Sequence, residues 1–181
     1  MKKTLKTVIS GSYRKYLPKI GIALEKFKKS NINVLSPLTE KVVMKSEGFV
    51  FLSTDNPEKT ADEIEKDFMI NIKKSDFMYL ANINGYVGES AATEIGVAII
   101  NGTPIIACEK INNISKKIPL EIQKILERGM FKILPINKIN TKNINNLNFK
   151  EFSKVKLATR EKLLFLSLIE KLLKGLKPTK R

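Results

Sequence analysis

Residues 77–109 read FMYLANINGYVGESAATEIGVAIINGTPIIACE, and this stretch indicates the fold class. Phe77–Asn82 is almost entirely apolar, as expected of a strand that is buried on both faces of a sheet. A glycine-containing turn follows, then a helix expected at Glu89–Asn101, with Gly102 as its stop signal. Pro104–Glu109 is a second buried strand. A strand, a helix and a strand in this order predict two parallel strands joined by a crossover helix.

The same alternation extends toward both ends of the chain. Apolar spacing and turn signals predict extended segments at Thr7–Ser12, Ile32–Pro37, Gly48–Asp55 and Phe131–Ile136. They predict helices at Tyr13–Lys29, Asn56–Asp76, Pro119–Arg128 and Ser153–Lys174. The Asn-rich segment before the last helix is expected to be a surface loop. We therefore predict an α/β, flavodoxin-like three-layer sandwich with a five-stranded, mainly parallel sheet in the order 2-1-3-4-5.

Length and composition predict a single domain spanning residues 1–181, with a C-terminal helix at 153–174 and a basic tail at 175–181. The chain has one cysteine and no histidine. This excludes an intramolecular disulfide, a multi-cysteine metal site and Ser-His or Cys-His nucleophile pairs. No apolar run is long enough to span a membrane. We expect a cytoplasmic protein with no membrane partner and no metal or redox cofactor.

The formal net charge of +15 is compatible with two kinds of anionic partner, a nucleic acid or a small anionic substrate. Only four of the 33 basic residues are arginine, and the lysines are spread evenly along the chain. Arginine is the residue that best makes forked contacts with phosphate. The composition therefore favours a small anionic substrate over a nucleic acid.

Two glycine-containing turns should meet at one crevice of this fold. In such sheets ligands bind beyond the carboxyl ends of the strands, where the strand order reverses. The turns SGSYR (10–14) and NGYVGES (84–90) follow the two strands at that point. Glu94 lies early in the next helix, among small apolar residues. It is either an ordinary solvent-exposed glutamate or a carboxylate that faces the crevice, where it can act as a nucleophile on an anomeric carbon.

The segments ISGSYRKY, KDFMINIKKSDFMYL and NGYVGESAATEIGVAIINGTPI resemble the nucleoside 2-deoxyribosyltransferase-like superfamily, including the deoxynucleoside 5'-monophosphate N-glycosidases. The resemblance covers residues 7–108. It implies that Glu94 is the nucleophile at C1' and that Asp67 assists departure of the base or positions the nucleophile. It implies N-glycosidic bond cleavage or transfer on a nucleoside or nucleoside 5'-monophosphate. The substrate-binding residues that it implies are Ser10, Gly11, Ser12, Tyr13, Arg14, Asn82, Gly85, Tyr86, Gly88 and Ser90.

The chain departs from the family pattern at two places. Gly88 stands where the studied enzymes carry an acid or a serine that contacts the sugar or the phosphate. The chain also shows no match to the C-terminal segment that the transferases lend to a partner subunit's site, which favours hydrolysis over transfer. The family resemblance nevertheless implies a homo-oligomer, a dimer or higher.

Two other functions remain alternatives. Phosphoribohydrolases of the lysine-decarboxylase-like group also place a glutamate behind a glycine-rich turn, but in a PGGxGTxxE pattern whose double glycine this chain lacks. The second alternative is a non-catalytic module on the same fold that binds a nucleotide or, less in keeping with the composition, a nucleic acid.

Overall fold

The computed structural model describes residues 4–46, 48–129, 131–147 and 158–175. Its centre is a five-stranded sheet in the order β2-β1-β5-β7-β9, in which all neighbouring strands run parallel. The strands are β1 (Lys6–Gly11), β2 (Asn33–Ser36), β5 (Phe77–Ala81), β7 (Ile105–Ala107) and β9 (Lys132–Ile133). Numbered as core strands along the chain, this is the order 2-1-3-4-5. The predicted flavodoxin-like sandwich is confirmed.

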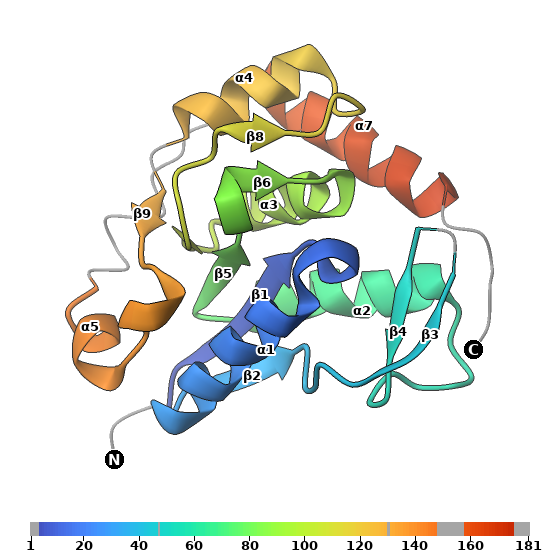
Figure 1. Ribbon diagram of the computed structural model, residues 1–181. Helices are drawn as coiled ribbons and strands as arrows, with labels where there is room; N and C mark the ends of the chain where they lie inside the picture. Colours follow the sequence, from blue (N-terminus) through green and yellow to red (C-terminus); the bar gives the residue numbers. More distant parts are fainter. Residues whose placement is uncertain (1–3, 47, 130, 148–157, 176–181) are drawn as a thin grey trace.

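Helices cover both faces of the sheet (Figure 1). One face carries α1 (Tyr13–Lys29) and α5 (Thr141–Asn145), whose apolar side chains join those of the sheet in one core cluster. The other face carries α2 (Ala61–Lys74) and α3 (Glu89–Asn101). On this side α7 (Thr159–Gly175) packs against α3, and α4 (Leu120–Arg128) packs against α7.

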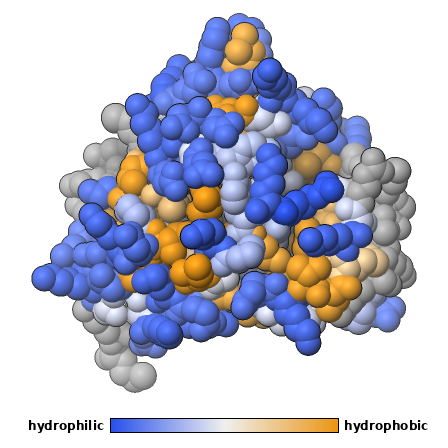
Figure 2. Space-filling view, in the orientation of Figure 1, coloured by the Kyte–Doolittle hydropathy of each residue, from blue (hydrophilic) through white to orange (hydrophobic). Residues whose placement is uncertain are grey.

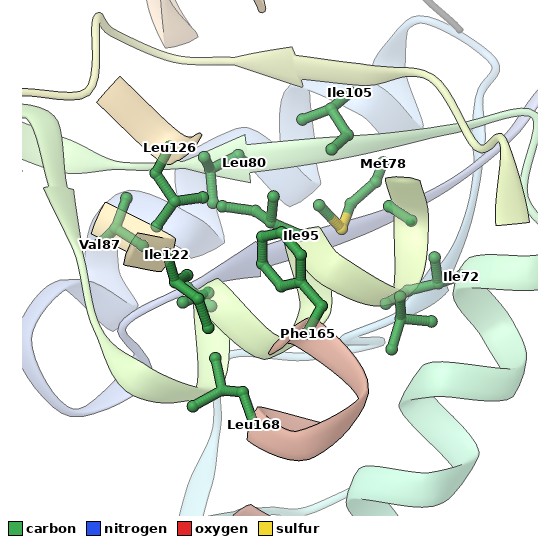
Figure 3. Packing of buried hydrophobic residues seen from close by; sticks show 14 of the residues in the cluster. Ile72, Met78, Leu80, Val87, Ile95, Ile105, Ile122, Leu126, Phe165 and Leu168 are labelled. Carbon is green, nitrogen blue, oxygen red and sulfur yellow. The ribbon is translucent and has the colours of Figure 1, made fainter. Parts of the chain in front are cut away.

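Helix α3 is enclosed, because every residue from Ala91 to Ala98 is buried. Figure 3 shows Phe165 and Leu168 of α7 in the same cluster as Ile95 of α3. Gly96 allows this close packing, since a Cβ at that position would lie 2.3 Å from the Phe165 ring. The helix that carries Glu94 is therefore fixed by neighbours on several sides.

Two small sheets lie outside the central one. β3 (Val42–Lys45) and β4 (Val50–Leu52) form an antiparallel pair beside α2 (Figure 1). β6 (Tyr86–Val87) pairs in parallel with β8 (Asn113–Ile114). The sequence predicted the extended segment that contains β4 but not its partner β3.

Helix α2 begins later than predicted. Its cap is Thr60, whose backbone N–H donates to Glu63 Oε2 at 2.8 Å in a capping box. Asn56 instead caps a separate turn, in which the Glu58 N–H donates to Asn56 Oδ1 at 2.9 Å. The prediction of a helix start at Asn56 was therefore wrong, because its side chain stabilises a turn rather than a helix.

The segment between β9 and α7 also differs from the predicted loop. It contains the short 3-10 helix η2 (Ile136–Lys138) and α5. The Asn143 N–H donates to Asn140 Oδ1 at 2.8 Å and thereby caps α5. The predicted start of the last helix at Ser153 and the tail 176–181 lie outside the described residues.

Within the described ranges, no helix is both long and apolar enough to cross a membrane. The face shown in Figure 2 carries hydrophilic residues over most of its area, with separate hydrophobic patches between them.

Candidate functional site

A cavity of about 640 Å³ lies beside the carboxyl end of β1 and the first turns of α1 and α3. This is the end of the sheet at which the strand order reverses, as predicted. The walls come from the turn after β1, the β3–β4 hairpin, helix α2, the start of α3 and the loop after β8. Segments far apart in the sequence therefore meet around one space.

Two buried carboxylates line the cavity, Glu94 of α3 and Glu65 of α2. They are only 6% and 7% exposed. Within the described part of the chain, Glu94 Oε2 and Glu65 Oε1 have no hydrogen-bond partner. Buried polar atoms without partners are rare in folded proteins and require an explanation, such as a ligand. Glu94 is thus a carboxylate that faces the crevice, and not an ordinary solvent-exposed glutamate.

Burial raises the pKa of both carboxyl groups, because desolvation disfavours the charged form. The pKa of Glu65 rises to about 7, and that of Glu94 rises well above its usual range, with the Glu65 charge as a second cause. The hydroxyl of Ser10 acts in the opposite direction and lowers the pKa of Glu94. This is the smallest of the three effects, and neither Ser10 Oγ nor Glu94 Oε2 has a hydrogen-bond partner among the described residues. The two glutamates therefore titrate as a pair that retains a proton near neutral pH.

Tyr13 lies next to this pair, and its hydroxyl donates to the backbone carbonyl of Ile9 at 2.9 Å. Burial raises the pKa of the Tyr13 phenol well above its usual value, and the charges of Glu94, Glu65 and Asp55 raise it further. The phenol therefore stays neutral, and its proton is already engaged.

Cationic and hydroxyl side chains form another part of the lining. Arg14, Lys15 and Lys117 supply positive charge, and the hydroxyl groups come from Ser12, Ser36, Ser90 and Ser115. The ammonium group of Lys15 lies 3.7 Å from the centroid of the Tyr86 ring, a cation–π contact that holds both side chains at the cavity wall. This part of the cavity suits an anionic group.

The remaining wall is mainly apolar. It consists of Phe49, Val50 and Leu52 from the β3–β4 hairpin, Ile64 and Phe68 from α2, and Ala91 from α3. Such a wall suits the face of a planar ring. The cavity thus combines a cationic region, an apolar wall and two carboxylates, each with a buried oxygen that has no hydrogen-bond partner within the described structure.

The structure brings most of the predicted site residues together. Those that line the cavity are Gly11, Ser12, Tyr13, Arg14, Tyr86, Gly88, Ser90 and Glu94. Ser10 is fully buried on β1, close enough to Glu94 to influence its pKa.

Asn82 and Gly85 do not line the cavity, and each has a structural explanation. Asn82 joins the ends of two strands, because its Nδ2 donates to the Glu109 carbonyl at 2.7 Å and the Glu109 N–H donates to its Oδ1 at 3.0 Å. Gly85 has a φ of +65°, and a Cβ there would lie 1.9 Å from Asn112 Oδ1. The turn conformation and this close contact account for the glycine.

Asp67 also lies outside the cavity, contrary to its predicted place beside Glu94. Its side chain is 48% exposed and forms an ion pair with Lys59. Residues two apart on a helix point about 200° apart, so Glu65 faces the cavity when Asp67 faces away. The acidic residue that α2 contributes to the site is therefore Glu65.

A signal for Glu65 is present in the sequence. Glu65 shares its helix stripe with Phe68, Met69 and Ile72, all of them buried. Acidic residues normally lie on the polar face of an amphipathic helix, so a glutamate on its apolar stripe differs from the other acidic residues. For Lys117 and Asp55, which also line the cavity, no comparable signal exists.

No family model matches this chain, and a search of the curated proteins finds no match. Among solved structures, the chain is similar to a conserved protein from Enterococcus faecalis V583, with 17% sequence identity and a TM-score of 0.37. That similarity covers 96% of this chain and 98% of the other.

Proposed function

We propose that the protein cleaves the N-glycosidic bond of a nucleoside or nucleoside 5'-monophosphate, with Glu94 as the nucleophile that attacks C1'. The observation that carries the proposal is the Glu94 carboxyl group, which is buried, lines a ligand-sized cavity and has an oxygen without a hydrogen-bond partner in the described structure. The resemblance of SGSYR and NGYVGESAATEIG to the nucleoside 2-deoxyribosyltransferase-like superfamily supports the same reaction.

The lining of the cavity suits both the phosphate and the base of a nucleotide. Arg14, Lys15 and Lys117 can balance the charge of a phosphate. The apolar wall around Phe49 and Phe68 can hold the base. The volume of about 640 Å³ lies within the range of roughly 300–1,000 Å³ that is usual for small-molecule sites.

The reaction needs a nucleophile that is held close to the anomeric carbon. Attack by a Glu94 oxygen on C1' breaks the bond to the base and leaves a glycosyl ester on Glu94. Water then hydrolyses this ester and releases the sugar. The rigid packing of α3 against α7 holds the nucleophile in place, which lowers the entropic cost of reaching the transition state.

The test is base release from a panel of nucleosides and 5'-monophosphates, in ribo and deoxy forms, measured by chromatography. Glu94→Gln preserves the size of the side chain but removes the nucleophile, so we expect a loss on the order of 10⁴-fold or more. The matched control is Glu58→Gln, on an exposed side chain in the turn before α2.

Base release by Glu94→Gln at the wild-type rate would contradict the proposal. Release of base from ribonucleotides alone would favour the phosphoribohydrolase alternative. A nucleotide that raises the melting temperature without any release of base would favour the non-catalytic binding module.

A further inference from the structure

Glu65 is the second buried carboxyl group of the cavity, and the nucleophilic role of Glu94 leaves it without a function. It is 7% exposed, lines the cavity, and its Oε1 has no hydrogen-bond partner within the described structure. A buried acid of this kind destabilises the fold, because its desolvation is not compensated. Stability alone therefore does not explain why a glutamate occupies this position.

We propose that Glu65 is the general acid and base of the reaction, which donates a proton to the departing base and then accepts one from the attacking water. This inference rests on the proposed function, because it assigns a second residue to the same bond cleavage. It replaces Asp67, which the sequence placed in that role.

The two steps balance in atoms and charge. In the first, the Glu94 carboxylate forms a bond to C1', the bond from C1' to the base nitrogen breaks, and the Glu65 carboxylic acid gives its proton to that nitrogen. In the second, the Glu65 carboxylate takes a proton from water, whose oxygen attacks C1' and releases Glu94 as a carboxylate. Glu65 ends protonated again, and the net reaction is addition of water across the glycosidic bond.

A proton donor is needed because a nucleobase that departs unprotonated leaves as an anion. A partly apolar cavity stabilises such an anion poorly. The pair of buried glutamates retains a proton near neutral pH. In the reactive form this proton lies on Glu65, so that Glu94 is the carboxylate that attacks and Glu65 is the acid that protonates the leaving group.

The other groups that face the pair are less suited to this role. The Tyr13 hydroxyl already donates to the Ile9 carbonyl. Asp55 Oδ2 accepts the Leu52 N–H at 2.7 Å, so this oxygen is already engaged. Ser10 on β1 is buried and does not line the cavity. The remaining charged residues of the lining are Arg14, Lys15, Glu89 and Lys117. Of these only Glu89 is a carboxylic acid, and it is half-buried, whereas Glu65 is buried.

The experiment compares two substrates that differ in how easily the base leaves. One is the nucleotide of the panel from which the protein releases base fastest. The other is its analogue with a more stable leaving group, which is 7-methylguanine for a purine or 5-fluorouracil for a pyrimidine. Glu65→Gln should slow release of the ordinary base by about 10²–10⁴-fold, the usual contribution of a general acid. Release of the activated base should fall less than about tenfold, since that base leaves without a proton.

The pH profile gives a second readout. The reactive form of the pair holds one proton, so the wild-type rate should rise as the pair loses its first proton near pH 7 and fall at higher pH as it loses the second. This fall should disappear in Glu65→Gln and remain in Glu58→Gln. A variant that merely loosened the fold would slow both substrates equally and would keep the wild-type pH profile.

Equal slowing of both substrates by Glu65→Gln would overturn the role of Glu65 while leaving Glu94 as the nucleophile. Loss of activity in Asp67→Asn together with full activity in Glu65→Gln would overturn it as well. Full activity in Glu94→Gln would instead contradict the proposed function itself, so the two failures are distinguishable.

Discussion

At the scale of single residues, the most informative feature is the pair Glu65 and Glu94. Each carboxyl group is almost fully buried and has an oxygen without a hydrogen-bond partner among the described residues. Desolvation raises the pKa of both carboxyl groups, and the charge of Glu65 raises that of Glu94 further. Residues that destabilise the empty protein in this way are typical of active sites.

This pair predicts that the protein becomes less stable as the pH rises. In the unfolded chain Glu65 loses its proton near pH 4.5, whereas in the folded protein it keeps the proton until about 7. Between these values the unfolded state binds fewer protons, so the free energy of unfolding falls with increasing pH. Glu94 acts in the same direction and extends the fall to higher pH.

The check is denaturant unfolding of the wild type and Glu65→Gln across this range. The variant has no charge to bury, so its advantage should grow from near zero at about pH 4.5 to on the order of 3 kcal/mol above about pH 7. The exposed control Glu58→Gln should follow the wild type. A wild-type stability that rises between these pH values, or a Glu65→Gln curve parallel to it, would show that Glu65 is ionised in the folded protein.

The same residues show what sequence reasoning reaches at this scale. Glu94 could be identified because it interrupts a run of small apolar residues behind a glycine turn. Glu65 lies among Asp62, Glu63 and Asp67, so only its place on the apolar stripe distinguishes it. The β3–β4 hairpin and α2 both line the cavity, and the hairpin determines which side of α2 faces it. No local sequence pattern encodes this long-range contact.

At the scale of elements, α3 is the helix on which the site depends. It is buried between the sheet, α2 and α7, and Gly96 lies directly beneath the Phe165 ring. Glycine costs a helix about 1 kcal/mol relative to alanine, so this glycine is retained for packing and not for helix formation.

Gly96→Ala should therefore destabilise the protein by about 1–3 kcal/mol, because the new methyl group would lie 2.3 Å from the ring unless α7 shifts. In a Phe165→Ala background the ring is absent, and the same substitution should instead stabilise by up to about 1 kcal/mol through helix propensity. A double-mutant cycle measured by denaturant unfolding checks the change of sign. A Gly96→Ala effect that is the same in both backgrounds would show that Phe165 does not restrict this position.

At this scale, an element can be predicted from the sequence when short patterns within it define where it begins and ends. The boundaries of α1 and α3 match the predicted Tyr13–Lys29 and Glu89–Asn101, because apolar spacing and end signals define both helices. Strand β3 was not predicted, since its four residues are stabilised mainly by pairing with β4. Such strands depend on tertiary contacts, which short sequence patterns do not record.

At the scale of the whole molecule, the strand order places the cavity. The reversal of order between β1 and β5 opens a crevice at their carboxyl ends, and α1 and α3 both begin there. The order itself could be predicted from the alternation of strands and helices. The shape of the cavity could not, because one wall comes from a hairpin outside the central sheet.

The prediction that belongs to this scale is self-association through α7. Leu163 and Leu166 are 60% and 49% exposed, and residues three apart lie on one face of a helix. The opposite side of α7 packs on the core through Phe165 and Leu168. An exposed pair of leucines on an otherwise packed helix is suited to a contact with a second copy of the chain.

We therefore expect the protein to form a homo-oligomer that Leu163→Lys weakens. Placing a charge in an apolar interface leaves it desolvated and unpaired, so the dissociation constant should rise at least about tenfold. Sedimentation velocity over a range of protein concentrations measures this change. The matched control is Leu38→Lys, on a leucine that is 52% exposed in the loop after β2 and should leave association unchanged. A monomeric wild type, or an oligomer that Leu163→Lys does not affect, would show that this face of α7 is not the interface.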